Sequence, residues 1–401
     1  MSRIYTGVCS FRWHCGKPQG EKRVLMSNLT RRNFFGVSAV VAGLGITACK
    51  KSDSDAGEKK ESDTNSTDAV GAPEELVKAA KEEGKLIVYG SCEEEYLNAV
   101  CANFKSLYGI DVQAQRLSTG EVAAKIEEEN GHPSADVWFG GTFDPQAQAA
   151  ELGLIEPYKS KHIDEIVERF RDPAKTKGHY VSAIYMGILG FGVNTERLAK
   201  LGIKEVPKCW KDLTDPRLKG EVQIADPQSA GTAYTALATF VQLWGEEKAF
   251  DFLKALHPNV SQYTKSGVTP SRNAARGETA VGIGFLHDYA LEKRQGAPLE
   301  LVVPCEGTGY ELGGVSILKG ARNIDNAKLF VDWALSKEGQ ELAWKQGDSL
   351  QILTNTTAEQ SPTAFDPNKL NLINYDFEKY GATEQRKALI EKWVQDVKLA
   401  K

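Results

Sequence analysis

The sequence predicts an α/β fold in which a mainly parallel sheet carries helices on its faces. Short β-rich runs alternate along the chain with segments of helical periodicity, and strands that alternate with helices pair in parallel. Each of the first three strands also ends in a loop rich in Ser, Thr or Gly that opens a helix. We therefore expect several helix N-termini to gather at one edge of the sheet.

Three strand-and-helix units open the folded region. The expected strands are 85–89, 110–117 and 136–139, and the helices that follow them are 93–108, 121–129 and 145–152. In the first helix the apolar side chains recur at helical spacing, at Tyr96, Leu97, Val100, Phe104 and Leu107. Gly109 is placed to end that helix.

The later part of the chain continues the alternation with longer apolar runs. Strands are expected at 186–193, 222–227, 278–285 and 299–304, and another follows Leu312. Helices are expected from the 229–232 loop through Trp244, and at 326–335, 338–344 and 382–399. We expect the strand at 278–285 to break at His287 and Asp288, and Asp288 either caps the helix that follows or contacts a ligand.

The N-terminal region reads as an export signal. Arg31 and Arg32 precede an apolar run of about ten residues, roughly half of what a bilayer-spanning helix needs, and Cys49 follows small residues. This pattern resembles a twin-arginine signal that ends in a bacterial lipobox. We expect translation to start at Met26, residues 1–48 to form the leader, and Cys49 to carry a lipid. Residues 49–72 are polar and charged, which predicts a disordered linker.

Composition excludes several function classes. The chain has 401 residues and a net charge of −5, with no basic stripe or Arg-rich arm that would indicate nucleic-acid binding. We expect a monomer without a cofactor.

Cys92 and Cys101 lie nine residues apart and form either a disulfide or two free thiols. No spacing in the folded region suggests a metal site.

The loops at the strand ends supply the candidate binding residues. Helix N-termini expose backbone N–H groups and a positive dipole end, which suit an anion. The alternative is that the hydroxyl residues only cap helices. The residues in question are Ser91, Ser118, Thr119, Gly120, Gly141, Thr142, Ser229, Gly231 and Thr232.

Several longer segments resemble the ferric-iron class of ABC-importer substrate-binding proteins. They are 86–91, 135–138, 153–157, 210–213, 226–232, 307–314 and 327–336. The resemblance is collinear from about Gly84 to Asn355. It implies a periplasmic-binding-protein type II fold, with two α/β lobes joined by crossing strands and closing on a ligand by a hinge. We place one lobe at 73–182 plus 305–401 and the other at 183–304.

The resemblance also bears on the ligand. Ferric-binding relatives carry two adjacent tyrosines where this chain has His287, Asp288 and the single tyrosine Tyr289. A His-Asp step together with Glu311 is similar to the branch that binds sugar phosphates. It implies that His287 donates to phosphate, while Asp288 and Glu311 accept from hydroxyls. If iron were bound instead, Tyr289 would be a ligand; otherwise it packs in the core.

These expectations combine into one function. We expect a lipid-anchored, extracytoplasmic solute-binding protein that captures a hexose phosphate or related organophosphate and delivers it to an ABC permease and its ATPase subunits. A ferric-iron-binding protein is the alternative. A phosphate-ester hydrolase is disfavoured, because adjacent residues on an extended chain point to opposite faces, so His287 and Asp288 do not form a catalytic pair unless the chain turns there. No Gly-x-Ser-x-Gly elbow accompanies them either.

Overall fold

The structure is a computed structural model that describes residues 71–399, apart from 174, 176 and 177. All of these residues belong to the compact unit Asp63–Lys401. The predicted leader, the lipid-bearing Cys49 and nearly all of the predicted linker lie outside the described residues. Among the described helices, none is both long enough and apolar enough to cross a membrane.

A mixed sheet forms the centre of this unit. Its main path runs in the order β2-β1-β3-β10-β5-β8-β6-β7, while β4 pairs with β10, and β9 and β11 pair with β5. The strands are β1 (Lys85–Gly90), β2 (Asp111–Arg116), β3 (Val137–Thr142), β4 (Ile155–Glu156), β5 (Ser182–Asn194), β6 (Val222–Ala225), β7 (Val260–Thr264), β8 (Val281–Phe285), β9 (Leu299–Val302), β10 (Tyr310–Leu318) and β11 (Ile352–Leu353).

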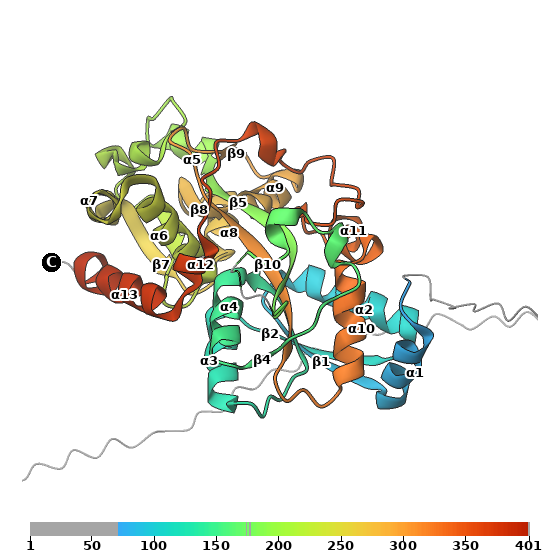
Figure 1. The fold of residues 1–401 in the computed structure, drawn as a ribbon. Coiled ribbons are helices and arrows are strands. Elements are labelled where there is room, and N and C mark those ends of the chain that lie inside the picture. Colours follow the sequence, from blue (N-terminus) through green and yellow to red (C-terminus); the bar gives the residue numbers. More distant parts are fainter. Residues whose placement is uncertain (1–70, 174, 176–177, 400–401) are drawn as a thin grey trace, which may run out of the picture. The chain divides into compact units, whose positions relative to one another are not determined.

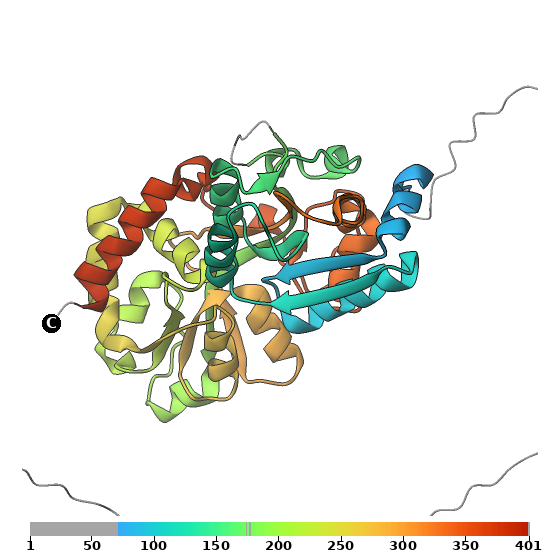
Figure 2. The ribbon, with the colours of Figure 1, turned by 90° about the horizontal axis from the view of Figure 1, so that it is seen from below.

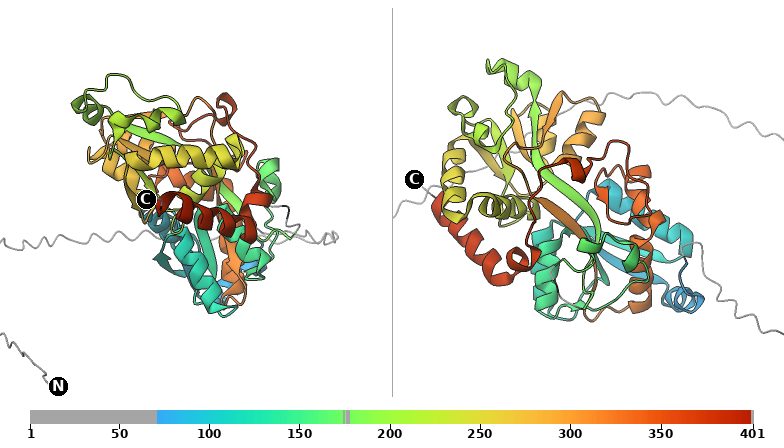
Figure 3. Two further views of the ribbon diagram at one scale, coloured as in Figure 1. Left: turned by 90° about the vertical axis from the view of Figure 1, so that its left-hand side faces the viewer. Right: turned by 45° about the horizontal axis from the view of Figure 1, so that its top comes forward.

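Two strands link the two ends of the sheet. The pairings of β1 with β2 and β3, and of β6 with β7 and β8, are parallel, as the alternation of strands and helices predicts. Every pairing of β5 and of β10 is antiparallel. The long strand β5 pairs with β10 through its first half and with β8 through its second half. It passes between two groups of elements, one built around β1, β2 and β3 and the other around β6, β7 and β8, as Figure 3 shows. All thirteen residues of β5 are buried, which accounts for its unbroken apolar run.

Helices cover both groups of strands (Figure 1). They are α1 (Glu74–Glu83), α2 (Glu94–Tyr108), α3 (Thr119–Glu129), α4 (Phe143–Glu151), α5 (Thr195–Lys200), α6 (Gly231–Trp244), α7 (Glu246–Leu256), α8 (Thr269–Ala275), α9 (Leu286–Arg294), α10 (Ile324–Leu335), α11 (Lys337–Lys345), α12 (Phe377–Gly381) and α13 (Thr383–Trp393). The helices at 94–108, 119–129 and 231–244 agree with the expected ones within two or three residues. Helices α1, α5, α7, α8 and α12 were not predicted.

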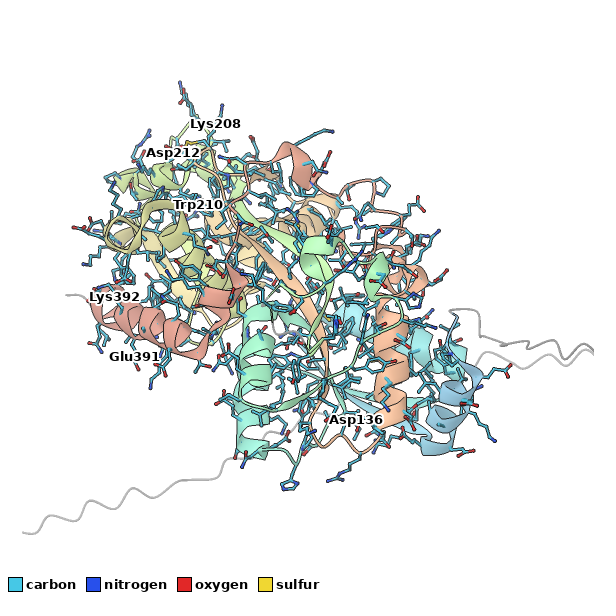
Figure 4. The ribbon with its side chains drawn as sticks, viewed as in Figure 1. Asp136, Lys208, Trp210, Asp212, Glu391 and Lys392 are labelled. Atoms are coloured by element: carbon cyan, nitrogen blue, oxygen red, sulfur yellow. A yellow bond between two sulfur atoms is a disulfide. The ribbon has the colours of Figure 1, made fainter. Side chains whose placement is uncertain are left out.

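Aromatic rings fill the core at both ends of the sheet. Phe104 packs edge-on against Phe330 and Trp333 near β1. At the other end, Trp210 packs between Phe191 and Phe240, and Figure 4 labels it beside Lys208 and Asp212. The buried indole N–H of Trp210 is satisfied because it donates to the carbonyl of Gly307, 3.1 Å away.

The structure decides between the two alternatives that the sequence left open for Cys92 and Cys101, and it adds a disulfide that was not predicted. Cys92 and Cys101 are free thiols. A disulfide joins Cys209 to Cys305, which are 96 residues apart in the chain. The side chain of Glu306, next to this disulfide, accepts hydrogen bonds from the backbone N–H groups of Trp210 and Lys211. The cross-link therefore ties the segment before β10 to the turn that carries Trp210.

The C-terminal helices return to the far end of the sheet. Helix α12 packs against α4, whereas α13 packs against α6, and Figure 2 shows α13 lying along the helices that flank β6 and β7. The ring of Trp393 meets the ring of Tyr263 edge-on at 5.0 Å. The lobe boundaries proposed from the sequence stay a prediction.

Candidate functional site

A pocket opens at the strand ends where the two groups of elements meet. The space between its walls, open solvent included, measures about 500 Å³. Ten of the residues singled out from the sequence line it: Ser91, Ser118, Thr119, Gly141, Thr142, Gly231, Thr232, His287, Asp288 and Glu311. The first and the last of them, Ser91 and Glu311, are 220 residues apart in the sequence, and the fold brings all ten to one pocket.

Two of the predicted residues do not line the pocket. Gly120 and Ser229 meet each other beside it: a Cβ atom on Gly120 would lie 2.9 Å from the carbonyl oxygen of Ser229. The hydroxyl of Ser229 is turned to the loop that follows β7, where it donates to the carbonyl of Lys265 at 2.9 Å. These two residues shape the wall instead of facing the space.

One side of the pocket is rich in hydrogen-bond donors. We call it the donor cluster; its members are Ser91, Thr119, Thr142, Gly231 and Thr232. Ser118 lines the same side but caps α3, because its backbone N–H and its hydroxyl both donate to Oε2 of Glu121. Helices α4 and α6 begin here without a side-chain cap, so their first backbone N–H groups have no intrahelical or capping partner. The hydroxyl of Thr142 is buried and has no hydrogen-bond partner among the described residues. A buried polar atom without a partner is costly, which indicates a place for a polar ligand.

Gly141 lets three loops converge at this cluster. Its φ of +78° lies in the left-handed region that favours glycine. A Cβ atom there would lie 2.6 Å from Oγ1 of Thr119 and 2.7 Å from Cβ of Ser91. The indole of Trp138 donates to Oγ of Ser91 at 3.1 Å, which leaves the Ser91 hydroxyl proton free for another acceptor.

A permanent cation faces the same space. Arg116, at the end of β2, lines the pocket, and its Nε donates to the carbonyl of Cys92 at 3.1 Å. That bond fixes the guanidinium plane while leaving its other N–H groups available. The sequence analysis did not single out Arg116, because an arginine at a strand end carries no signal of its own.

Acidic side chains surround an imidazole at another part of the pocket. We call Glu93, His287, Asp288 and Glu311 the acidic cluster. Nε2 of His287 lies 3.2 Å from Oε1 of Glu93 and 3.7 Å from Oδ1 of Asp288. The side chain of Glu311 lies near the same ring, since a Cβ atom on Gly187 would be 2.8 Å from Glu311 Oε1 and 2.9 Å from His287 Cε1.

The cluster holds His287 in its charged form. Burial opposes that charge, but the carboxylates of Asp288, Glu93 and Glu311 outweigh burial and raise the pKa of His287 to about 9. Burial also opposes ionisation of Glu93, yet the hydrogen bond and charge of His287 lower the pKa of Glu93 below its usual value. Nδ1 of His287 is buried and has no partner among the described residues, so a donor is left free for a ligand.

The other two acids hold their protons more firmly. Burial raises the pKa of Asp288 to about 7, against the attraction of His287. Burial likewise raises the pKa of Glu311 well above its usual value. At neutral pH the cluster therefore contains both charged and neutral carboxyl groups, which can accept from and donate to hydroxyl groups.

The structure corrects the expectation that His287 and Asp288 stand on an extended chain. Helix α9 begins at Leu286, so both residues lie in its first turn and their side chains approach each other. Tyr289 is fully buried, and its ring fits against the backbone of β5 and β8: a Cβ atom on Gly192 would lie 2.0 Å from its Cδ1. It does not line the pocket, in agreement with the packing interpretation.

Besides Arg116, Glu93 and Gln351 are functional candidates that were not singled out from the sequence. Nε2 of Gln351 lies 3.1 Å from Oε1 of Glu93 and 3.4 Å from Nε2 of His287. Glu93 was placed at the start of a helix and given no role, although its position directly after a strand-end loop was a usable signal. Gln351 is 258 residues from Glu93, and no local pattern connects them.

This fold and this pocket define a solute-binding protein. The chain belongs to the family of bacterial extracellular solute-binding proteins, whose model matches residues 133–379. An uncharacterized protein of Haemophilus influenzae is 83% identical over 323 residues, which cover 80% of this chain and 93% of that protein. The resemblance to ABC-importer substrate-binding proteins is thereby confirmed.

Solved structures agree on the fold. The periplasmic binding protein AfuA of Actinobacillus pleuropneumoniae, solved with exogenous fructose 6-phosphate bound, is 68% identical, with a TM-score of 0.78 over 79% of this chain and 100% of that chain. The periplasmic binding protein P5PA is 47% identical, with a TM-score of 0.75 over 78% of this chain and 99% of that chain. The predicted two-lobed α/β fold class is confirmed.

Ferric-binding relatives are more distant. The major ferric iron-binding protein of Neisseria meningitidis is 26% identical over 264 residues, which cover 64% of this chain and 77% of that protein. The sequence placed this chain in a group that contains both kinds of binding protein, and both kinds are found among its relatives.

Proposed function

We propose that this chain captures a small phosphorylated solute that also carries hydroxyl groups, such as a hexose phosphate, and hands it to an ABC permease. The observation that carries the proposal is the chemical division of the pocket. The donor cluster and Arg116 suit a phosphate, whereas the acidic cluster suits uncharged hydroxyls. Carboxylates facing a phosphate would repel it, so a ligand that satisfies both clusters has two different ends.

In this proposal His287 joins the two ends. As an imidazolium with a free Nδ1 donor, it offers a charge-assisted hydrogen bond to a phosphate oxygen. Asp288, Glu311 and Glu93 then hold hydroxyl groups of the sugar. The fructose 6-phosphate reported with AfuA, which is 68% identical to this chain, supports the same ligand class.

Ferric iron is the alternative ligand. The ferric-binding relatives favour it, but a hard trivalent cation needs anionic oxygen ligands. Tyr289 does not reach the pocket, and burial raises its pKa well above the usual value, which opposes a phenolate there. The proposal therefore ranks iron below a phosphorylated solute.

The remaining parts of the proposal concern the setting. We infer that the chain is a monomeric lipoprotein tethered through Cys49 on the extracytoplasmic face of a membrane, and that its partners are a permease and the associated ATPase subunits. We also infer that it breaks no bond, although His287 and Asp288 are adjacent. A chromogenic phosphate ester tests this last point: turnover by the wild type that is lost in His287→Ala would contradict it.

Thermal-shift screening tests the ligand. The purified protein is heated with hexose phosphates, glycerol phosphates, phosphonates and ferric citrate, and specific binding raises the melting temperature by mass action. We expect a shift with a hexose phosphate that is reduced in His287→Ala. A shift with ferric citrate alone would contradict the proposed ligand. A sugar-phosphate shift in His287→Ala equal to that of the wild type would contradict the proposed role of His287.

A further inference from the structure

An ion pair beside the pocket joins the two groups of elements. Nζ of Lys265 lies 2.6 Å from Oε1 of Glu121. Glu121 is in the first turn of α3, which follows β2, whereas Lys265 directly follows β7 at the opposite end of the sheet. Neither side chain lines the pocket, so neither touches a solute held there.

Each partner is tied to a loop that does line the pocket. Oε2 of Glu121 accepts from the backbone N–H of Ser118 at 2.9 Å and from the Ser118 hydroxyl at 2.8 Å. The carbonyl of Lys265 accepts from the hydroxyl of Ser229, and the next residue, Ser266, lines the pocket. The ion pair thus connects the loop that opens α3 with the loop that follows β7.

The backbones of these loops also touch. Gly120 lies so close to the carbonyl of Ser229 that a Cβ atom would be 2.9 Å from that oxygen. The hydrogen bond from Lys265 is the largest cause that lowers the pKa of Glu121 to about 2, so the Glu121 carboxylate in this contact is ionised at neutral pH. The arrangement is a charged contact formed only when the two sides of the pocket are together.

We propose that Glu121 and Lys265 are positioning residues for solute capture, which form an ion pair across the closed pocket and thereby slow release of the solute. This inference rests on the proposed function, because it concerns release of the same solute. When the two sides separate, both charges return to water. The pair therefore favours the closed arrangement over the open one and leaves the contacts with the solute unchanged.

Dissociation kinetics test the inference. In Glu121→Gln the amide oxygen can still accept from Ser118, so the helix keeps its capping box and loses only the charge. Lys265→Met removes the cation, and Lys265→Arg keeps it. Because Lys265 is exposed, we expect fructose 6-phosphate to dissociate about two to five times faster from each charge-removing variant. Salt at about 0.5 M should erase the difference.

The double variant separates a pair from two independent effects. We expect Glu121→Gln with Lys265→Met to release the solute no faster than either single variant, and Lys265→Arg to behave as the wild type. Arg276→Met is the matched control, because Arg276 pairs with Glu278 in an exposed pair on one side of the pocket. Additive effects in the double variant, or unchanged dissociation in both single variants, would overturn the inference.

A measurement without solute keeps this inference separate from the proposed function. Small-angle X-ray scattering reports the radius of gyration of the purified protein at low salt. We expect a larger radius in Glu121→Gln than in the wild type, and no change in Arg276→Met. If the wild type bound no sugar phosphate, the proposed function would fail while this comparison still decided the inference: equal radii would overturn it.

Discussion

Nε2 of His287 lies 3.2 Å from Oε1 of Glu93, so the first turn of the helix after β8 meets the residue that precedes the helix after β1. This contact joins the two groups of elements inside the pocket. It also helps to keep the imidazole protonated, because the carboxylates around His287 outweigh the cost of burying a cation and raise its pKa.

Glu93→Gln should lower the pKa of His287 from about 9, because it removes one of the charges that favour the imidazolium. The amide keeps the size of the side chain and its place beside Gln351. Titration of the His287 ring by NMR checks the shift. Glu95→Gln is the control, since Glu95 is exposed on the same helix. An unchanged His287 titration in Glu93→Gln would contradict the assignment.

The stability of the protein should depend on pH through His287. Its pKa is raised from 6.5 to about 9 on folding, so the folded state holds the proton more tightly. The stabilisation is complete below pH 6.5 and is lost as the pH rises toward 9. Urea unfolding in steps between pH 6 and pH 10 measures this loss. His287→Gln should flatten the curve in that window, and an equally steep curve in the variant would count against the prediction.

Asp288→Ala and Glu311→Ala should reduce discrimination among sugar phosphates more than they reduce affinity for inorganic phosphate. Both carboxyl groups belong to the acidic cluster, which faces the hydroxyl end in the proposed function. Calorimetric titration with glucose 6-phosphate, fructose 6-phosphate and inorganic phosphate gives the three affinities. Equal losses for all three would contradict a ligand with two different ends.

Arg116→Gln should weaken binding of a sugar phosphate about tenfold, because it removes a charge-assisted hydrogen bond. The same substitution should leave the melting temperature of the solute-free protein nearly unchanged, since the side chain is exposed. Arg276→Gln serves as the control at an exposed site away from the pocket. Calorimetry at low and high salt checks the effect, and an Arg116→Gln affinity equal to the wild type would remove Arg116 from the site.

Gly141→Ala should destabilise the protein more than Gly131→Ala. Both glycines have positive φ, which costs an alanine about 1–2 kcal/mol. A Cβ atom at Gly131 meets nothing within 4 Å, whereas at Gly141 it would lie 2.6 Å from Oγ1 of Thr119. Urea unfolding gives the loss of stability in each variant, and the difference between the two losses measures the steric clash at Gly141. Equal losses would contradict the prediction and would show that the loops can move apart.

Local patterns predicted much of the fold. Strand β5 was visible as an apolar run around 186–193, and α2 as apolar residues at helical spacing. Helices α1 and α7 were missed although each keeps apolar residues at helical spacing, at Leu76, Val77 and Ala80 in α1 and at Ala249, Leu253 and Leu256 in α7, so the sequence did carry a signal for both. A helix after Asp288 was expected, but α9 begins at Leu286, so His287 and Asp288 lie inside its first turn and do not precede it.

The site was predictable where its residues belong to strand-end loops. Ser91, Thr119 and Thr142 each follow a recognisable strand, so their meeting at one sheet edge follows from topology. Arg116 and Gln351 could not be found in this way, because their place in the pocket depends on the packing of distant segments. Such contacts leave no trace in local sequence.

The disulfide between Cys209 and Cys305 has a practical consequence for preparing the protein. Cross-links of this kind persist in oxidising surroundings and are rare in a reducing cytosol. Protein made in an ordinary bacterial cytosol would begin with Cys209 and Cys305 reduced, and it would also carry the free, partly exposed Cys101. Expression with export, or oxidation after purification, would yield one covalent species, and mass spectrometry of the intact chain would tell the two preparations apart by two hydrogen atoms.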